Sequence, residues 1–475
     1  MIRDLHEKLL SGETSAVELV EKSFVTIDQK DEELHAFLNV AKDSALEQAI
    51  RVDKKLKNGE SVDLLAGLPC ALKDNICVTG TKTTAASKIL ENYVAPYDAT
   101  VASRVKENDA VIMGKTNMDE FACGSSTENS AFGPSKNPVD TSRVPGGSSG
   151  GSVVAVASDE VVWALGTDTG GSIRQPASFC GVVGLKPTYG RVSRYGVIAM
   201  GSSLDQVGPV TKTVEDAAIV LSRISGRDEL DATSAQSGDK PYEDYCVGDI
   251  AGAKIGIPKE YLSDGLDDDV KKVFMEAVEK FKELGAEIVD VSLPHTEYAL
   301  ATYYIIMPSE LSSNLARFDG IRYGGVEGTD SQTVLDQYLE TRGKGFGPEI
   351  KRRIMLGTYT LSAGYYDAYY KKAQKVRALI RKDFEDVFEK VNYVFTPTTP
   401  EPAFKFGDKT DDPIKMYLSD IYTVTANLAG VPALSIPIGD VTMEGKELPV
   451  GGQLIGKWFD EEGIFNAGHT FEINK

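Results

Sequence analysis

Short, largely apolar runs separated by amphipathic segments recur along most of this chain. Residues 67–77, 109–114, 254–258 and 288–291 have the length and composition typical of buried β-strands. Residues 1–57 instead repeat apolar side chains at the three-to-four-residue spacing of helices. Such an alternation of strands and helices is typical of α/β proteins, in which helices cover the faces of a central sheet.

The best-defined helix lies between the last two of these runs. Asp267, Asp268 and Asp269 stand at its N-terminal end, where the helix dipole favours carboxylates, and Gly285 suits its C-terminal cap. Its apolar side chains recur at intervals of three and four residues and therefore share one face. They are Val270, Val273, Phe274, Ala277, Val278, Phe281 and Leu284.

The C-terminal part of the chain repeats the same pattern. A long helix is predicted over residues 363–390. Apolar runs at 393–395, 433–437 and 451–455 predict three further strands. Strands and helices thus continue to alternate almost to the end of the chain.

These elements predict an α/β fold with a large mixed, mostly parallel central sheet covered by helices on both faces. The chain has no segment rich in Pro, Gly or Ser that would serve as a linker between separate units. We therefore expect one domain over residues 1–475, with a helical elaboration around 295–365.

The composition is that of an ordinary globular protein, with 41% hydrophobic and 26% charged residues. Charges at Arg3, Asp4, Glu7 and Lys8 occupy positions where a signal peptide needs its apolar core. No apolar run reaches the roughly 18–20 residues of a membrane span. The five cysteines form no Cys-x-x-Cys pair, which favours free thiols in a reducing compartment. A cytoplasmic protein without a membrane contact is expected.

The chain carries 51 basic and 71 acidic residues, a net charge of −20. Because like charges repel, such a chain is a poor ligand for the phosphates of nucleic acids. If it acts on a nucleic acid, another subunit should hold that molecule. The four histidines form no His-Glu-x-x-His pattern, and together with the scattered cysteines they predict no metal site.

Two loops rich in glycine and serine flank an apolar stretch in the first half of the chain. The first covers residues 145–152 and the second covers residues 166–174. Glycine has no Cβ, so such loops can bring backbone N–H groups close to a reacting atom. A serine held there can act as a nucleophile while neighbouring amides stabilise an oxyanion.

Other interpretations of this region compete with that one. Residues 146–150 match the Gly-x-Ser-x-Gly motif of α/β-hydrolases, but that motif follows directly on a strand, and residues 137–145 are a polar segment with two prolines. A phosphate-binding loop at residues 114–116 would need glycine at position 109, where the chain has Asp109. The loops could also be glycine-rich turns with a purely structural role.

Lys73 lies within the largely apolar run at 67–77. A charged lysine is costly to bury, so such a residue lies at an edge, forms an ion pair or loses its proton. Asp74 follows it directly and, on a strand, points to the opposite face, so it need not neutralise Lys73. Lys73 is therefore either a satisfied structural residue or a catalytic base.

Together, Lys73 and the two loops resemble the amidase signature family. The matching segments are residues 72–75, 146–152 and 166–176, in an order and spacing that fit the family. The resemblance implies the amidase signature fold and a Ser–Ser–Lys triad for hydrolysis of amides.

The resemblance assigns Ser172 as the nucleophile, Ser148 as the bridging serine at a cis peptide bond and Lys73 as the general base. A serine needs a base at neutral pH, and no histidine lies in these segments. Burial can lower the ordinary lysine pKa of about 10.4 by up to about 3–5 units, which makes a working base. The expected oxyanion donors are the backbone amides of Thr169, Gly170 and Gly171.

Within that family, further segments resemble the glutaminase subunits of tRNA-dependent amidotransferases. They are residues 118–129, 317–324, 351–359, 364–370 and 416–420. This resemblance implies hydrolysis of glutamine to glutamate, with the ammonia used to amidate glutamyl-tRNA(Gln), aspartyl-tRNA(Asn) or both. It also implies a heterotrimer with B and C subunits. The B subunit would bind tRNA, ATP and Mg²⁺, so this chain needs no cofactor of its own.

Recognition of free glutamine requires one partner for its α-carboxylate and another for its α-ammonium. Arg353 and Asp420 match the family's glutamine site, since arginine pairs bidentately with carboxylates and aspartate accepts from an ammonium. The other residues that the resemblance places at the substrate are Tyr304, with the adjacent Tyr303 as the alternative, Gly124 and Ser125.

Three alternatives stay open at this point. A free-standing amidase acting on aryl or aliphatic amides would share the triad but lack charged partners for an α-amino acid. An inactive scaffold is the second, against which the presence of all three triad residues argues. Arg353 could also be a solvated helix charge, because Lys351 and Arg352 stand beside it.

Overall fold

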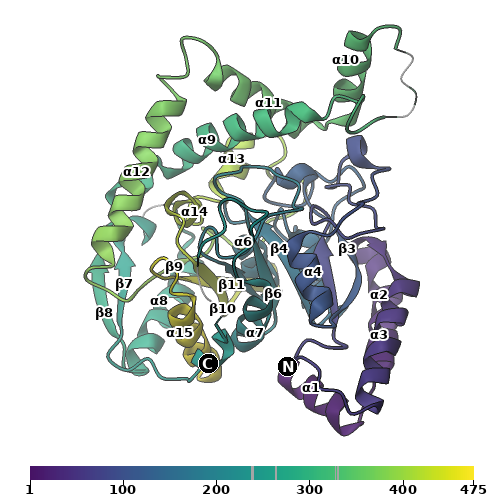
Figure 1. Ribbon diagram of the computed structural model, residues 1–475. Coiled ribbons are helices and arrows are strands. Elements are labelled where there is room, and N and C mark those ends of the chain that lie inside the picture. Colours follow the sequence, from purple (N-terminus) through teal and green to yellow (C-terminus); the bar gives the residue numbers. More distant parts are fainter. Residues whose placement is uncertain (237–239, 263–264, 327, 329–330) are drawn as a thin grey trace.

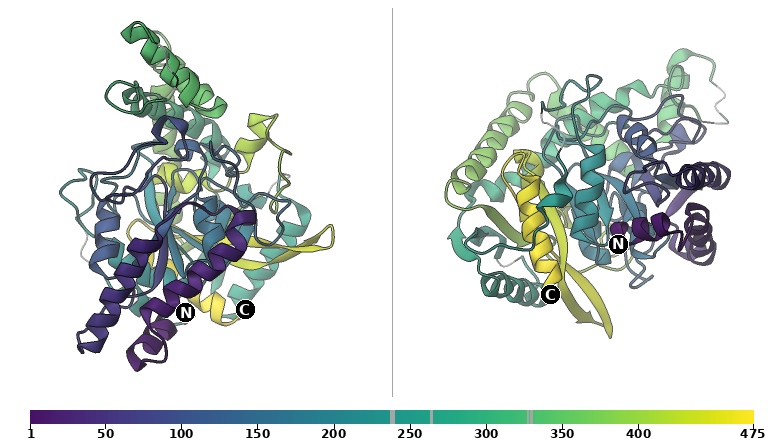
Figure 2. Two further views of the ribbon diagram at one scale, coloured as in Figure 1. Left: turned by 90° about the vertical axis from the view of Figure 1, so that its right-hand side faces the viewer. Right: turned by 60° about the horizontal axis from the view of Figure 1, so that its bottom comes forward.

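The computed structural model describes residues 1–236, 240–262, 265–326, 328 and 331–475. Within these residues, an 11-stranded sheet has the strand order β1-β3-β2-β4-β6-β5-β10-β11-β9-β7-β8. Helices surround this sheet, as Figure 1 and the two further views in Figure 2 show. Within the described ranges, no helix combines the length and apolar character that crossing a bilayer requires.

The bounds of these elements follow the chain. The strands are β1 (Phe37–Val40), β2 (Pro69–Lys73), β3 (Val111–Thr116), β4 (Trp163–Asp168), β5 (Val183–Lys186), β6 (Gln206–Thr211), β7 (Lys254–Pro258), β8 (Glu287–Val291), β9 (Tyr393–Pro397), β10 (Ala433–Met443) and β11 (Lys446–Ile455). The helices are α1 (Ile2–Ser11), α2 (Ala16–Leu34), α3 (Lys42–Lys57), α4 (Thr100–Glu107), α5 (Gly150–Ala157), α6 (Arg174–Cys180), α7 (Val214–Ile224), α8 (Asp268–Glu283), α9 (Ala299–Asn314), α10 (Val334–Gly345), α11 (Pro348–Leu361), α12 (Tyr370–Val387), α13 (Pro413–Leu418), α14 (Val424–Ala429) and α15 (Glu461–Ile473).

The sheet is mixed, as predicted, but the expectation that it is mostly parallel is wrong. Of the neighbouring strand pairs in the described part of the chain, four are parallel and six are antiparallel. The hairpin of β10 and β11 shows one reason. Its two strands are joined through Glu444 and Gly445, both with positive φ. A turn this short can connect only antiparallel strands.

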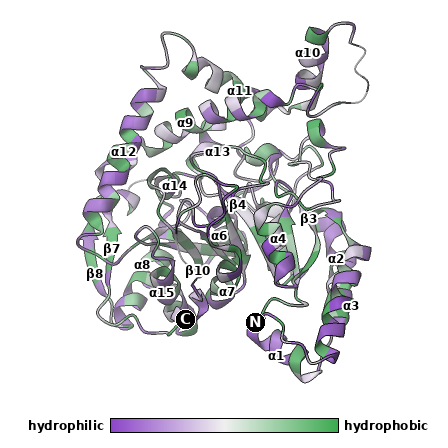
Figure 3. Ribbon diagram, viewed as in Figure 1, coloured by the Kyte–Doolittle hydropathy of each residue, from purple (hydrophilic) through white to green (hydrophobic). Residues whose placement is uncertain are grey.

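Helices cover both faces of the sheet, as predicted. On one face, α6 lies so close to β11 that the Gly451 amide donates to Ser178 Oγ at 2.8 Å. On the other face, α15 packs Gly468 against Leu434 and Ile436 of β10. In Figure 3 the strands between these layers are largely hydrophobic, while outer helices such as α3 and α12 carry long hydrophilic stretches.

Most predicted elements are present, with shifted ends. The helix predicted after Asp267 is α8, and the Asp267 side chain caps it by accepting from the amides of Asp269 and Val270. Gly285 follows that helix with a φ of 92°. Residues 1–57 are not helical throughout, because β1 interrupts them and pairs with β3. The long helix near 363–390 is α12 and begins only at Tyr370.

Candidate active site

The parallel strands β3, β2 and β4 end at one edge of the sheet, where the candidate residues gather. Lys73 is the last residue of β2, and Asp168 is the last residue of β4. Ser149 precedes the first residue of α5 as its N-cap. In open α/β sheets the carboxyl ends of parallel strands form the usual ligand crevice. The fold thus brings Lys73 and both glycine-serine loops together, as the sequence predicted.

Lys73 is fully buried, and its amine is surrounded by oxygen atoms. Its Nζ atom lies 2.8 Å from Ser148 Oγ, 2.8 Å from Ser149 Oγ and 2.9 Å from Thr167 Oγ1. The Thr167 carbonyl oxygen is 3.3 Å away. Among the described residues, all hydrogen-bond partners of Lys73 are therefore uncharged.

Burial lowers the pKa of Lys73 to about 7, because the more distant carboxylates of Asp119 and Asp168 offset only part of the desolvation. Asp74 points to the opposite face of β2, as predicted, and pairs with Lys115 at 3.3 Å. A substantial share of the Lys73 side chains is then a neutral amine near neutral pH. A neutral amine has a lone pair that can accept a proton.

The two glycine-serine loops are bonded to each other around Ser148. The peptide bond between Gly147 and Ser148 is cis, as the family resemblance implied. The Gly147 amide donates to Gln175 Oε1 at 2.9 Å, and the Ser149 amide donates to the Ser172 carbonyl at 3.1 Å. Ser148 is fully buried, whereas Ser172 keeps 8% of its surface exposed. Ser172 is therefore the more accessible of the two serines.

Asp168 is buried and stabilises the conformation of the second loop, residues 166–174. Its carboxylate accepts from the amides of Gly171 at 2.9 Å and Ile173 at 3.2 Å, and pairs with Arg174 Nε at 3.0 Å. Burial works to raise the pKa of Asp168, but Arg174 and the Asn427 amide outweigh it and hold the pKa at about 2. The carboxylate is thus ionised at neutral pH and fixes the loop that carries Ser172.

The amides expected as oxyanion donors are not equivalent. Gly171 uses its amide on Asp168. The amides of Thr169 and Gly170 donate to no acceptor among the described residues. Of the three predicted donors, Thr169 and Gly170 are therefore the ones that present free N–H groups next to Ser172.

Two glycines let distant segments pack onto this loop. A Cβ on Gly170 would lie 2.6 Å from the Tyr303 ring. On Gly171 it would lie 2.2 Å from Thr423 Oγ1, and the φ of +132° there also favours glycine. Thr423 Oγ1 donates to the Gly170 carbonyl at 2.6 Å. Side chains from α9 and from the segment before α14 thus form a wall beside the loop that carries Ser172.

Arg353 and Asp420 are both buried, with 2% and 7% of their surfaces exposed. Arg353 is therefore not a solvated helix charge, although Lys351 and Arg352 are exposed. The Asp420 carbonyl oxygen lies 3.0 Å from Thr423 Oγ1, the hydroxyl that contacts Gly170 of the loop. Burial raises the pKa of Asp420 to about 7. Among the described residues, Arg353 and Asp420 form no ion pair with each other.

The close packing of α9 on α11 sets where Arg353 lies. A Cβ on Gly357 would be 1.8 Å from the Pro308 carbonyl oxygen, so the two helices touch backbone to backbone there. Arg353 precedes Gly357 by four residues, and Tyr304 precedes Pro308 by four, so each side chain lies on the contacting face of its helix. The Arg353 guanidinium carbon is accordingly 5.4 Å from the Tyr304 ring centroid.

The structure distinguishes the two adjacent tyrosines. Tyr304 donates its hydroxyl to Asp420 Oδ2 at 3.3 Å, whereas Tyr303 packs on Gly170. Ser125 Oγ donates to the same Asp420 oxygen at 2.7 Å. Tyr304 and Ser125 therefore meet at the Asp420 carboxylate, and Tyr303 packs on the loop that carries Ser172 instead.

Asp119 is a buried residue for which the sequence analysis gave no role. Its carboxylate accepts from the amides of Thr127 at 2.9 Å and Asn129 at 3.1 Å. A Cβ on Gly124 or Gly147 would lie 2.3 Å and 2.2 Å from this carboxyl group. Gly124, which was expected at the substrate, thus lets Asp119 approach and shapes the loop that presents Ser125.

Glu349 and Tyr417 are two further residues that the sequence analysis missed. Glu349 Oε1 lies 2.7 Å from Arg353 Nε, and the Tyr417 hydroxyl donates to the same oxygen at 2.9 Å. The four-residue spacing of Glu349 and Arg353 on a helix is a signal that could have indicated the first contact.

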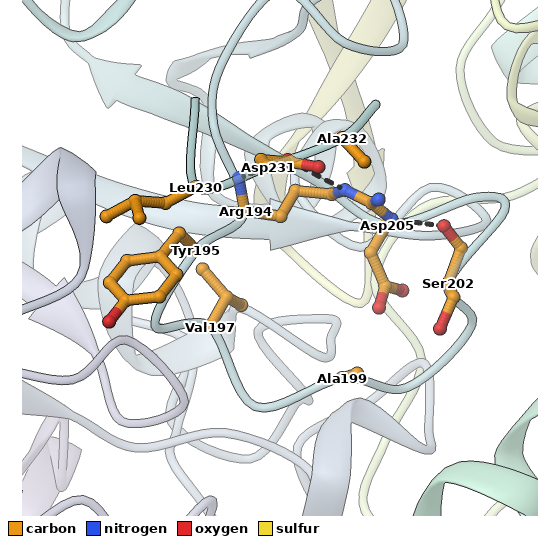
Figure 4. A pocket seen from close by; sticks show the side chains of 9 residues that line it. All are labelled: Arg194, Tyr195, Val197, Ala199, Ser202, Asp205, Leu230, Asp231 and Ala232. Atoms are coloured by element: carbon orange, nitrogen blue, oxygen red, sulfur yellow. Dashed lines mark hydrogen bonds and ion pairs between the residues drawn. The ribbon is translucent and has the colours of Figure 1, made fainter. Parts of the chain in front are cut away.

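A cavity of about 200 Å³ is lined by residues of segments 194–205 and 230–232. Figure 4 shows Arg194 extended between Asp231 and Ser202, with Asp205 also in the wall. Asp205 Oδ1 accepts from Thr169 Oγ1 at 2.7 Å. This carboxylate therefore connects the cavity to the loop that carries Ser172. In the part of the chain that the structure describes, no group of three or more His, Cys, Asp or Glu side chains is placed to hold a metal ion.

The family model described as Amidase matches residues 18–465. The chain belongs to the amidase signature family. The A subunit of Glutamyl-tRNA(Gln) amidotransferase from Carboxydothermus hydrogenoformans is 55% identical over 99% of this chain and 96% of that protein. The corresponding protein of Geobacillus kaustophilus is also 55% identical, with the same coverage.

Solved structures of the amidase signature family superpose on the whole chain. The crystal structure of the A subunit of Glutamyl-tRNA(Gln) amidotransferase from Thermotoga maritima has a TM-score of 0.82 and 44% identity, covering 100% of this chain and 96% of that one. A peptide amidase from Stenotrophomonas maltophilia also gives 0.82, at 29% identity, covering 99% and 96%. Because members with different names share the fold, the substrate of an amidase signature enzyme must be argued from its site.

Proposed function

We propose that this chain is the glutamine-hydrolysing subunit of a tRNA-dependent amidotransferase. The observation that carries the proposal is the pair of buried, opposite charges beside the Ser172 loop, Arg353 and Asp420, which form no ion pair with each other. Free glutamine has one α-carboxylate and one α-ammonium, and two separate charges match them. An amidase for uncharged amides gains nothing from two such buried groups. The names of the full-length relatives support the same assignment.

In the proposed reaction, Ser172 Oγ attacks the side-chain amide carbon of glutamine. The Ser172 proton passes to Ser148 Oγ while the Ser148 proton passes to neutral Lys73 Nζ, since a hydroxyl both donates and accepts. The Lys73–Ser148 distance of 2.8 Å is that of a hydrogen bond along which this transfer can occur. The free amides of Thr169 and Gly170 stabilise the oxyanion.

The leaving nitrogen receives its proton back along the same path and departs as ammonia. The Lys73 ammonium lies among uncharged oxygens, so losing this proton relieves a buried charge. Glutamine is left as a γ-glutamyl ester on Ser172. Water then attacks the ester with Lys73 and Ser148 again moving the proton, which releases glutamate and restores the serine.

The ammonia is used elsewhere in the proposed complex. B and C subunits complete a heterotrimer in the cytoplasm, and the B subunit binds ATP, Mg²⁺ and the misacylated glutamyl-tRNA(Gln), which it amidates. The net charge of −20 on this chain agrees with a tRNA held by another subunit. An interface as large as those of permanent complexes is expected between the subunits.

The experiment that tests this function measures glutamate produced from glutamine. The chain is assayed alone and then with the subunits that co-purify with it, with and without aminoacyl-tRNA and ATP. Slow hydrolysis by the isolated chain, and a rise on adding partners, tRNA and ATP, is expected. Full turnover by the isolated chain, equal on butanamide and indifferent to all additions, would show a free-standing amidase.

A further inference from the structure

Glu349 is a carboxylate at the candidate site that takes no part in the proposed reaction. Its side chain and that of Arg353 are 11% and 3% exposed, and their ion pair is 2.7 Å long. The pair is spaced i, i+4 on α11 with the glutamate nearer the N-terminus, which is the favourable order. Because the guanidinium is buried, Glu349 keeps it from being an unpaired buried charge.

Tyr417 connects this pair to Asp420. Its hydroxyl donates to Glu349 Oε1 at 2.9 Å, and its ring stacks on Tyr304 with the centroids 3.8 Å apart. The guanidinium carbon of Arg353 lies 5.3 Å and 5.4 Å from the two ring centroids. Tyr304 in turn donates to Asp420. One connected set of side chains therefore holds Arg353 at one end and Asp420 at the other.

The ion pair with Glu349 leaves other N–H groups of Arg353 available as hydrogen-bond donors. Arginine carries five N–H groups, and Glu349 takes the one on Nε. Nη1 faces the Met307 sulfur at 3.9 Å, which is a weak acceptor. The Asp420 carboxylate accepts only from the hydroxyls of Ser125 and Tyr304 among the described residues. No cation of the described residues pairs with Asp420. If Glu349 did not hold Arg353, Asp420 would therefore compete for the guanidinium.

We propose that Glu349 is a positioning residue that determines specificity. By holding the Nε edge of Arg353, it prevents this guanidinium from pairing with Asp420. Two separate charges then remain for the two charged groups of an α-amino acid amide. This inference rests on the proposed function and adds the residue that keeps the two recognition charges apart.

The test compares four amides in the full chain with the subunits that co-purify with it. Glutamine has both charges, glutaramate only the carboxylate, 4-aminobutanamide only the ammonium and butanamide neither. Glu349→Gln should raise KM for the three charged amides about tenfold or more, with kcat nearly unchanged, and leave kcat/KM for butanamide within about twofold. The loss with 4-aminobutanamide is the distinctive result, because this substrate makes no use of Arg353.

Two matched variants separate this role from a general effect. Arg352→Gln removes the exposed arginine that also contacts Glu349, and it should leave all four amides within about twofold of wild type. Glu349→Asp keeps the negative charge and should restore most of the preference for glutamine. Equal losses on butanamide, or unchanged KM values on all four amides, would overturn the proposal.

A crystal structure of the Glu349→Gln variant gives an independent readout. It should show Arg353 within ion-pair distance of Asp420, and an Arg353 that stays apart from Asp420 would contradict the proposal. A wild-type complex that does not prefer glutamine to butanamide would refute the proposed function instead. The position of Arg353 in the variant would still decide the role of Glu349.

Discussion

The amine of Lys73 and the hydroxyl of Ser148 lie 2.8 Å apart in a fully buried part of the molecule. The described residues give this amine only uncharged hydrogen-bond partners, so burial lowers its pKa to about 7. A lysine that served as a positive charge would be expected to have a carboxylate partner, as Lys115 has in Asp74. The arrangement favours Lys73 as a proton acceptor.

Lys73→Arg should therefore abolish glutamine hydrolysis, because a guanidinium does not lose its proton in a protein. We expect a loss of about 10²–10⁴-fold in kcat, the usual contribution of a general base. Lys73→Ala should be at least as damaging. Ammonia release is the measurement, and thermal unfolding controls for folding. Substantial activity in the arginine variant would show that Lys73 acts only as a charge.

The pH dependence of kcat/KM should differ between glutamine and butanamide. Lys73 must be neutral to act as a base, and Asp420 must be ionised to bind an ammonium; the pKa of each is about 7. Both groups are active when deprotonated, so kcat/KM for glutamine should rise with pH through about 7 as two groups titrate. Butanamide should show the titration of one group. Identical profiles would mean that Asp420 does not take part in recognition.

Arg353→Gln and Asp420→Asn should weaken glutamine binding rather than the chemical steps. Each leaves one charge of the zwitterion unpaired in a buried site, which costs about 2–5 kcal/mol. Butanamide has neither charge and should be affected far less. Measuring KM and kcat for both amides tests this, and equal losses on both would assign the two residues to the fold.

Gly357→Ala should move Arg353 by separating α11 from α9. The added Cβ would lie 1.8 Å from the Pro308 carbonyl oxygen, which backbone movement alone can relieve. We expect lower thermal stability and a raised KM for glutamine. Gly343→Ala in α10 is the matched control, since nothing lies within 4 Å of its Cβ and alanine favours a helix by about 1 kcal/mol. Equal effects of the two variants would argue against the helix contact.

Local sequence patterns indicate the region around Lys73, Ser148 and Ser172 more directly than the surroundings of Arg353 and Asp420, for a physical reason. The two loops and Lys73 are short segments at strand ends, and glycine and serine content alone marks the loops. Glu349 and Tyr417 touch only because α11 and α13 pack together in the fold, which no local pattern shows. The choice between Tyr303 and Tyr304 likewise depends on the rotation of α9.

In the sheet, too, the sequence predicted features that depend on neighbouring residues and missed features that depend on contacts between distant segments. Apolar runs located most of the strands, and the aspartates and Gly285 located the ends of α8. Both signals are local properties of the sequence. β1 was missed because its four residues lie between two amphipathic helices, and its pairing partner β3 is distant in the chain. The turn at Glu444 and Gly445 makes β11 run antiparallel to β10. The backbone conformation of this turn was not evident from the composition.

The most direct test of the central claim is the site of covalent labelling by a glutamine analogue with an electrophilic side-chain carbon. Mass spectrometry of the intact chain and of its peptides should find one adduct, on the peptide that contains Ser172. The adduct should be absent from Ser172→Ala and should form much more slowly in Lys73→Arg. Labelling of a cysteine, or an undiminished adduct in Ser172→Ala, would contradict the serine mechanism and the proposed function built on it.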